Sequence, residues 1–482
     1  MTNLRTRLHA RWVIGYAGTS HQIFEDADVV LEGDSIIFVG HEYPGNVDVS
    51  FNYGESIISP GFIDLDALSD LDTTILGYDN APAMLKGRVW PRTYVERGPY
   101  EMYTPEELAF QKRFAFAQLI KNGITTAAPI ASLFYRAWGE TVDEFEAAAL
   151  AAQDLGLRVY LGPAYRTGNQ VVESDQTIVA DYDEARGLAE LEAAVEFARR
   201  MDAHTSPLLR GLLAPDRVET CTAELLRRTA LASDEHQLMV RLHCCQSTAE
   251  LALVREQHGC TPPEWLHRLG FLSARCLLPH GIHLSEDELH YFSKSGATIV
   301  HCPLVSARHG GVLRSLTRYK SHGMNMAMGT DTWPPDMILN LQLGVMMNRI
   351  AEQTMTSCRS EDLFGAATLG GAIALHRPDL GRLVEGAKAD VTIIDVSRTL
   401  QTTDPIQTLM TGVAGRDVSN VFINGRHVLK DKQLPGFDED QHWISAQRQF
   451  DKIASLYPER TLGHPSIDTI FSSSYPRVNR YD

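Results

Sequence analysis

The chain lacks several features that would assign its class at once. Its seven cysteines are odd in number and scattered, and no two of them form a CxxC pair, which argues against a disulfide framework and against a zinc ribbon. No run of about 18 apolar residues occurs, so we expect no membrane span. The first residues contain no apolar stretch followed by a small-residue cleavage site, as a secretory signal would. These absences favour a cytoplasmic protein.

Positive charge is also scarce. The 44 lysines and arginines stand against 61 aspartates and glutamates, which gives a net charge of −17. A chain this acidic repels nucleic acid and anionic membranes over most of its surface, so we expect neither as a partner. Internal repeats and low-complexity segments are missing as well. The hydrophobic content of 44% is typical of a globular protein with a sizeable core.

Both ends of the chain are rich in short strand patterns. The segment ADVVLEGDSIIFVG alternates around a Gly-Asp turn at Gly33, and the segment VFINGRHV contains an Asn-Gly turn at Asn424. Such turns between alternating apolar residues are typical of β-hairpins. Because two β-rich ends flank one long middle, we expect them to pair into a single β-sandwich, made of residues 1–59 and 376–434.

The middle of the chain, residues 60–375, alternates helical patterns with short apolar runs. Helical stretches such as TPEELAFQKRFAFAQLIKNG precede runs such as ITTAAPI and RVYLGPA, and eight runs can be counted when ISPGFIDLD is taken as the first. Strands separated by helices at this spacing predict parallel βα units closed into a barrel. The predicted fold is therefore α/β, a (β/α)₈ barrel with the sandwich beside it and a helical tail at residues 435–482.

Polar residues close most of the apolar runs, and the C-terminal strand ends of such a barrel form its active-site mouth. His243 ends the fifth run, His280 ends the sixth and Asp331 ends the eighth. Two imidazoles and a carboxylate from separate strands can bind a metal ion and its water, or they can transfer protons without a metal. We therefore predict that these three residues form the centre of the site.

A second group of arginine, histidine and aromatic residues follows the same strand ends or lies in the loop GRVWPRTYVERGPYEMY. Arginines beside aromatic rings at a barrel mouth suit a planar or anionic substrate, although salt bridges and packing at the rim would produce the same pattern. The candidate substrate contacts are Trp90, Arg92, Tyr165, Arg166, His301, Arg308 and His309.

A series of motifs occurs in order along residues 12–430. They are VVLEGDSIIFVG, ISPGFIDLD, LHCCQS, PHGIHLSEDEL, GATIVHCP, MGTDTW, AATLGGAIAL, GRLVEGAKADVTIID and VFINGRHV. In type and order they resemble the amidohydrolase superfamily, in the branch with S-adenosylhomocysteine deaminase, guanine deaminase and the triazine chlorohydrolases. The resemblance implies a hydrolase acting on a carbon–nitrogen bond of a small cyclic or aromatic compound. It also implies a homodimer or higher homo-oligomer, and no organic cofactor is expected.

The resemblance also implies a role for each residue of the central trio. His243 matches the metal ligand at the end of strand five. His280 matches the strand-six histidine that holds the substrate or the hydrolytic water. Asp331 matches the strand-eight aspartate that binds metal and takes the proton of the water.

Two departures from the family pattern leave the chemistry of the site open. The His-x-His pair of strand one is replaced by Asp66 and Leu68, and the glutamate three residues after the strand-five histidine is Gln246, which cannot carry a proton. One alternative is a Zn²⁺, Mn²⁺ or Fe²⁺ ion held by His243, Asp331 and Asp66. The other is a metal-free site.

Three functions therefore remain to be compared. The first is carbon–nitrogen hydrolysis, with Asp331 as general base, His280 assisting, and His243 and Gln246 also in the catalytic site. The second is a metal-independent lyase, hydratase or isomerase on the same barrel, since the His-x-His pair and the glutamate are both replaced. The third is a non-catalytic relative, against which the retained trio argues.

Overall fold

The computed structural model describes residues 4–77, 90–97, 102–130, 136 and 138–478. Within these residues eight parallel strands follow one another around a sheet, and the last pairs with the first. This closed barrel confirms the predicted α/β class and all eight strand positions. The barrel strands are β6 (Phe62–Leu68), β8 (Ile124–Ile130), β9 (Arg158–Leu161), β13 (Leu209–Pro215), β14 (Met239–Arg241), β15 (Cys276–Pro279), β16 (Thr298–His301) and β17 (Met326–Met328).

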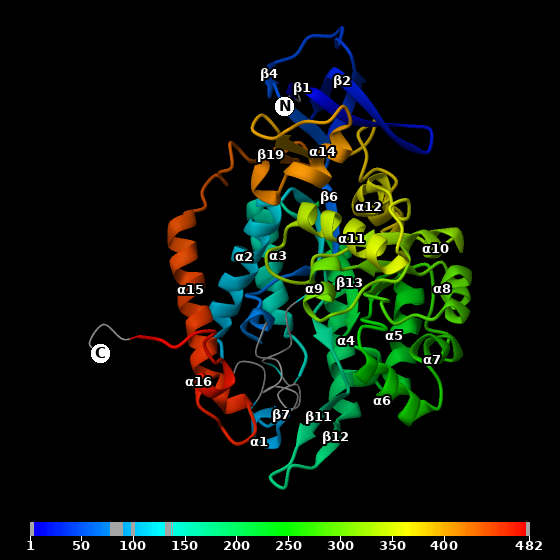
Figure 1. Cartoon of the computed structure of the whole chain (residues 1–482), viewed down its shortest axis with the longest axis vertical. Helices are drawn as coiled ribbons and strands as arrows, with labels where there is room; N and C mark the ends of the chain where they lie inside the picture. The colour runs from blue at the N-terminus through cyan, green and yellow to red at the C-terminus, as the bar shows by residue number, and fades with distance from the viewer. Residues whose placement is uncertain (1–3, 78–89, 98–101, 131–135, 137, 479–482) are drawn as a thin grey trace.

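Helices connect the barrel strands and surround them (Figure 1). Thr104 caps the first long helix and Glu107 completes the capping box, while Gly156 ends the next helix with φ 87°, a left-handed conformation that glycine adopts at little cost. No described helix is both long enough and apolar enough to cross a bilayer. The helices are α1 (Arg92–Val95), α2 (Pro105–Lys121), α3 (Val142–Leu155), α4 (Glu184–Asp202), α5 (Ala223–His236), α6 (Thr248–His258), α7 (Pro262–Arg268), α8 (Leu289–Ser295), α9 (Pro303–Arg308), α10 (Leu316–Ser321), α11 (Met337–Glu352), α12 (Ser360–Gly365), α13 (Gly371–Ala374), α14 (Pro405–Gly412), α15 (Glu439–Leu456) and α16 (Ile467–Ile470).

The two β-rich ends of the chain form one sheet, as predicted. Its order is β20-β19-β18-β5-β1-β2-β3, and β4 pairs with β1. Both predicted hairpins are present, and Asn424 and Gly425 have the positive φ values that their turn requires. The boundaries of the three predicted domains stay a prediction. The sheet consists of β1 (Arg5–Ala17), β2 (Ser20–Glu32), β3 (Ser35–Gly40), β4 (Val49–Asn52), β5 (Ser56–Pro60), β18 (Val391–Asp395), β19 (Val418–Ile423) and β20 (Arg426–Leu429).

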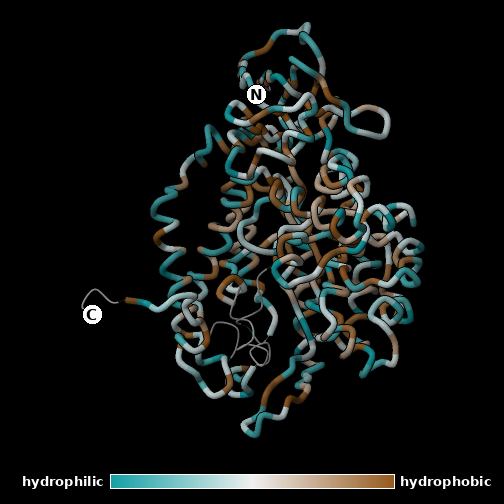
Figure 2. Tube along the Cα trace, viewed as in Figure 1, coloured by the Kyte–Doolittle hydropathy of each residue, from teal (hydrophilic) through white to brown (hydrophobic). Residues whose placement is uncertain are grey.

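Apolar side chains form separate cores inside these layers, and Figure 2 shows hydrophobic segments along the interior strands and hydrophilic ones on many outer turns. Along residues 239–242, which are β14 and the residue after it, the side chains alternate between two cores. Val240 and Leu242 pack with helix residues such as Leu225, whereas Met239 packs with Leu277 of the neighbouring strand. This alternation has the period of two expected of a strand, so it determines which residues of β14 point into the barrel.

The sandwich lies against the N-terminal ends of the first barrel strands. Gly61 donates its N–H to the carbonyl of Asp390 at 3.0 Å, and Thr392 Oγ1 donates to the carbonyl of Gly123 at 2.9 Å. The C-terminal strand ends therefore open away from the sandwich. In Figure 1 the small sheet of β7 (Trp90–Pro91), β11 (Gly168–Val172) and β12 (Ile178–Tyr182) lies at that far end.

The C-terminal extension packs along the barrel rather than standing free. Helix α15 runs beside α2, and Lys452 Nζ lies 2.6 Å from Glu107 Oε2. Gln111 Nε2 donates to Gln449 Oε1 at 2.9 Å. These contacts attach the predicted helical tail to the first βα unit of the barrel.

Candidate active site

Four predicted residues meet at the C-terminal end of the barrel. His243 Nε2 lies 3.6 Å from Asp66 Oδ1, and His280 Nε2 lies 3.7 Å from Asp331 Oδ2. The two imidazole rings stack with centroids 5.4 Å apart. Asp331 is 14% exposed, and the other three side chains are 5% exposed or less. Access from solvent is therefore on the Asp331 side.

The backbone is unusual at two of these four positions. His280 has φ 78° and Asp331 has φ 52°, a left-handed region that residues other than glycine rarely adopt. Both are held by neighbouring strands, since His280 donates its N–H to Val300 at 2.9 Å and Asp331 donates its N–H to Asp66 at 2.8 Å. Non-glycine residues in such conformations gather at functional sites.

Burial controls the protonation of the four groups. Desolvation lowers the pKa of His243 and of His280 well below the usual value, so both imidazoles are neutral. Burial, together with the neighbouring Asp66 carboxylate, raises the pKa of Asp331 well above its ordinary value. Burial raises the pKa of Asp66 to about 6, against the opposing charge of Arg241.

His243 is fixed in one orientation. Its Nδ1 lies 2.7 Å from the carbonyl oxygen of Asp216. Because a carbonyl only accepts, Nδ1 carries the proton of the neutral ring and Nε2 presents its lone pair to Asp66.

Arg241 is a functional candidate that the sequence analysis missed. It is 1% exposed, its Nε lies 3.8 Å from Asp66 Oδ1, and its Nη1 donates to the carbonyls of Ala128 at 2.8 Å and Pro129 at 3.1 Å. A signal was present in the sequence. Arg241 is the one charged residue of an apolar strand and precedes His243 by two positions, so the strand alternation places both on the same face.

Arg217 was missed as well, and it explains the position of Gln246. Gln246 Oε1 accepts a hydrogen bond from Arg217 Nη1. Arg217 follows β13 and bridges to the backbone of His243, and its charge lowers the pKa of Asp331. Glu250 accepts the N–H of Gln246 at 2.7 Å and so holds this loop in place.

The donor atoms are spaced as a metal site would require. Asp66, His243 and His280 each offer one ligand atom, and these atoms lie within 4.8 Å of one another. Asp66 Oδ1 and both ring nitrogens of His280 have no hydrogen-bond partner among the described residues. Two imidazoles and a carboxylate are a donor set that zinc accepts. In spacing and donor type the site is therefore compatible with a divalent ion.

One neighbouring charge opposes such an ion. The guanidinium of Arg241 faces the same oxygen of Asp66 that would bind the metal. A dication on that oxygen and the guanidinium would repel each other in a site with little solvent to screen them. Leu68, at the position of the family's second strand-one histidine, adds no ligand.

Three of the predicted substrate contacts lie near the mouth. Arg308 Nη1 donates at 2.7 Å to Thr332, the residue after the strand-eight aspartate. His309 is close enough for its charge to lower the pKa of His280. His301 is buried, neither of its ring nitrogens has a hydrogen-bond partner in the described chain, and burial lowers its pKa to about 3.

Tyr165 and Arg166 support the site from behind. The hydroxyl of Tyr165 lies 3.0 Å from Thr229 Oγ1 on the outer helix α5, within the core between strands and helices. Arg166 is buried and lies 3.4 Å from the carboxylate of Asp216, the residue whose carbonyl holds His243. Both side chains thus have partners within the protein, and the substrate contacts that the sequence predicted for them stay a prediction.

Trp90 and Arg92 lie at the rim. Arg92 forms ion pairs with Glu173 and with Asp181 of the β11–β12 hairpin, at 2.5 and 3.3 Å. These ion pairs are of the kind that the sequence analysis gave as the alternative to a substrate contact, a salt bridge at the rim. Trp90 packs under the guanidinium of Arg166, whose Cζ is 5.7 Å from the ring centroid. Residues 87–89 and 98–101 of this loop lie outside the described residues.

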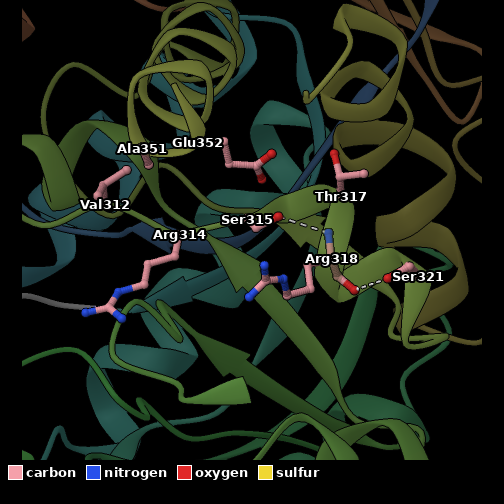
Figure 3. A pocket seen from close by; sticks show the side chains of 8 residues that line it. All are labelled: Val312, Arg314, Ser315, Thr317, Arg318, Ser321, Ala351 and Glu352. Atoms are coloured by element: carbon pink, nitrogen blue, oxygen red, sulfur yellow. Dashed lines mark hydrogen bonds between the residues drawn. The ribbon is translucent and has the colours of Figure 1, made fainter. Parts of the chain in front are cut away.

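An open hollow of about 750 Å³ lies elsewhere on the surface (Figure 3). Its walls come from α10, the preceding loop and the end of α11, and they include Arg314, Arg318 and Glu352. None of the strand-end residues described above lines it. Its walls also lack a facing pair of imidazole and carboxylate groups, so we place the candidate active site at the barrel mouth.

The fold and the buried imidazole–carboxylate pairs together define a (β/α)₈ barrel of enzyme type. The model of the amidohydrolase family matches residues 57–428, and the chain belongs to this family. The resemblance predicted from the motifs is therefore confirmed.

Individual relatives share nearly the whole chain. The 5-methylthioadenosine/S-adenosylhomocysteine deaminase of Pyrococcus abyssi is 26% identical over 425 residues, covering 86% of this chain and 92% of the relative. A zinc-bound adenosine deaminase from Xanthomonas campestris superposes with a TM-score of 0.75 at 20% identity, covering 93% and 98% of the two chains. The zinc complex of atrazine chlorohydrolase from Arthrobacter aurescens also has a TM-score of 0.75 at 20% identity, covering 92% and 100%.

Proposed function

We propose that this protein is a hydrolase that deaminates a small cyclic or aromatic compound, or displaces a related leaving group from it. The observation that carries the proposal is the pair of His280 Nε2 and Asp331 Oδ2, 3.7 Å apart at the solvent-accessible side of the barrel mouth. The named activity of the Pyrococcus abyssi relative, a deaminase acting on a nucleoside, supports the same reaction class.

In this proposal Asp331 transfers the protons and His280 orients the reactants. Atoms 3.7 Å apart can both hydrogen-bond to one water molecule, which then attacks an sp² carbon of the substrate. Asp331 takes the proton of this water, and its raised pKa makes its carboxylate a stronger base than an exposed one. Neutral His280 orients the water or the substrate. The protonated Asp331 then returns the proton to the departing amine.

No step of this mechanism passes through a metal ion. A Zn²⁺, Mn²⁺ or Fe²⁺ ion held by His243, Asp331 and Asp66 would activate water, but the guanidinium beside Asp66 opposes the binding of such an ion. Gln246 orients Arg217 and takes no proton. The proposal further includes a small-molecule substrate and a cytoplasmic homo-oligomer.

The test is the variant Asp331→Asn, assayed by ammonia release from a panel of purine nucleosides, purine bases and amino-triazines. Turnover should fall at least ~100-fold, the usual contribution of a general base. Wild-type turnover should also fall as pH drops, since Asp331 must be ionised and its pKa is raised. The matched control is Asp34→Asn, which changes an aspartate of the sandwich paired with Lys388. Equal turnover in the Asp331 variant and the control would exclude this mechanism.

A further inference from the structure

An arginine faces the residue that replaces the family's strand-one histidine. Where the family has a metal-binding histidine the chain has Asp66, and Arg241 lies across the barrel with its Nε 3.8 Å from Asp66 Oδ1. An aspartate and an arginine facing each other in the interior are complementary in charge. A histidine in place of Asp66 would offer Arg241 no such partner.

Arg241 is held in this position by the barrel itself. Its Nη1 donates to two successive carbonyls of β8, those of Ala128 and Pro129, at 2.8 and 3.1 Å. Its Nε and Nη2 have no hydrogen-bond partner among the residues that the structure describes. One edge of the guanidinium is thus anchored across the barrel to β8, the strand beside the one that carries Asp66, and Nε is presented to the carboxylate of Asp66.

The neighbouring carboxylates do not compete for this arginine at close range. Asp216 is paired with Arg166 at 3.4 Å, and Asp64 accepts hydrogen bonds from the hydroxyl of Thr330 at 2.6 Å and from its N–H at 3.1 Å. Asp66 Oδ1 has no hydrogen bond of its own in the described chain. The buried cation nearest to that oxygen is the guanidinium of Arg241.

We propose that the guanidinium of Arg241 takes the place of the divalent ion of zinc-bound relatives as the positive partner of Asp66. Asp66 is then balanced by a fixed positive charge instead of by a shared metal, while His243, whose Nε2 lies 3.6 Å from Asp66 Oδ1, is oriented by the carbonyl of Asp216. Charge repulsion in a buried site disfavours a second cation at the same oxygen. The inference concerns the site of the proposed hydrolysis, but its test measures zinc binding and needs no substrate.

The experiment measures zinc by elemental analysis and by titration calorimetry on the full chain purified without chelator. The wild type should retain less than about 0.1 zinc per chain after dialysis, since the guanidinium opposes the ion. Arg241→Met removes the charge at similar length and should bind zinc at least about tenfold more tightly. Arg241→Lys keeps a positive charge and should behave as the wild type. The gain in zinc affinity should vanish in the double variant D66N/R241M. That loss would show that the zinc binds at Asp66.

Two results would overturn the inference. The first is about one zinc per chain in the wild type that is lost in Asp66→Asn, because Asp66 would then be a metal ligand despite Arg241. The second is a folded Arg241→Met variant whose zinc affinity equals that of the wild type. If Arg241→Met does not fold, the wild type and Asp66→Asn decide the question by themselves. Failure of the Asp331 experiment would leave these zinc measurements unaffected, so the two proposals can fail separately.

Discussion

A buried ion pair joins the barrel to the sandwich, and its loss should be costly. Arg158, the first residue of the third barrel strand, binds Asp390 through two hydrogen bonds, Nε to Oδ2 at 3.0 Å and Nη2 to Oδ1 at 3.1 Å. Both side chains are at most 4% exposed. Arg158→Met leaves the Asp390 carboxylate buried without a counter-charge. Removing one partner of such a pair lowers the free energy of unfolding by ~3–5 kcal/mol. We expect a loss at the lower end of this range, because the N–H of Asn424 still donates to Asp390 at 2.7 Å.

The assay is equilibrium urea unfolding followed by far-ultraviolet circular dichroism. Arg228→Met is the control, since Arg228 and Glu224 form an exposed pair of the i,i+4 type, worth ~0.3–0.5 kcal/mol. The double variant R158M/D390N should be more stable than Arg158→Met by at least ~1 kcal/mol, because no unpaired charge remains buried. The reasoning fails if Arg158→Met costs no more than the control.

Two further outcomes follow from single hydrogen bonds. Tyr165→Phe should leave turnover within about twofold of wild type and cost ~1 kcal/mol of stability, because its hydroxyl contacts Thr229 and not the mouth; a large rise in KM would instead restore it as a substrate contact. His21, which contacts Thr368 at 2.9 Å, has its pKa lowered from 6.5 to about 4 by burial. The unfolded chain therefore binds this proton first, so the free energy of unfolding should fall by up to ~3 kcal/mol between about pH 6.5 and 4. In His21→Gln that contribution to the acid-induced loss should be absent, and an unchanged pH profile in this variant would contradict the assignment.

The sequence was sufficient for the parts of the fold that depend on local pattern. Short apolar runs between helical patterns located all eight barrel strands, and the Asn-Gly turn at Asn424 located the last hairpin. His243, His280 and Asp331 could be found because strand ends meet at one mouth in any closed parallel barrel. These features need only the order of elements along the chain.

The direction of individual side chains could not be found in the same way. Tyr165 and Arg166 follow a strand end just as His280 does, yet their partners are a helix residue and Asp216 behind the mouth. At a strand end the backbone leaves its regular alternation, and His280 itself has φ 78°. Whether such a residue faces the mouth then depends on the chain packed beside it.

By itself, then, the sequence determined the barrel, the pairing of the two chain ends and the departures at Asp66 and Gln246. Only the tertiary structure decided what those departures face. Arg241 lies 175 positions from Asp66 in the chain and Arg217 lies 29 positions from Gln246. Such contacts between partners leave no periodic trace in sequence, because they form only when barrel closure brings distant strand ends together.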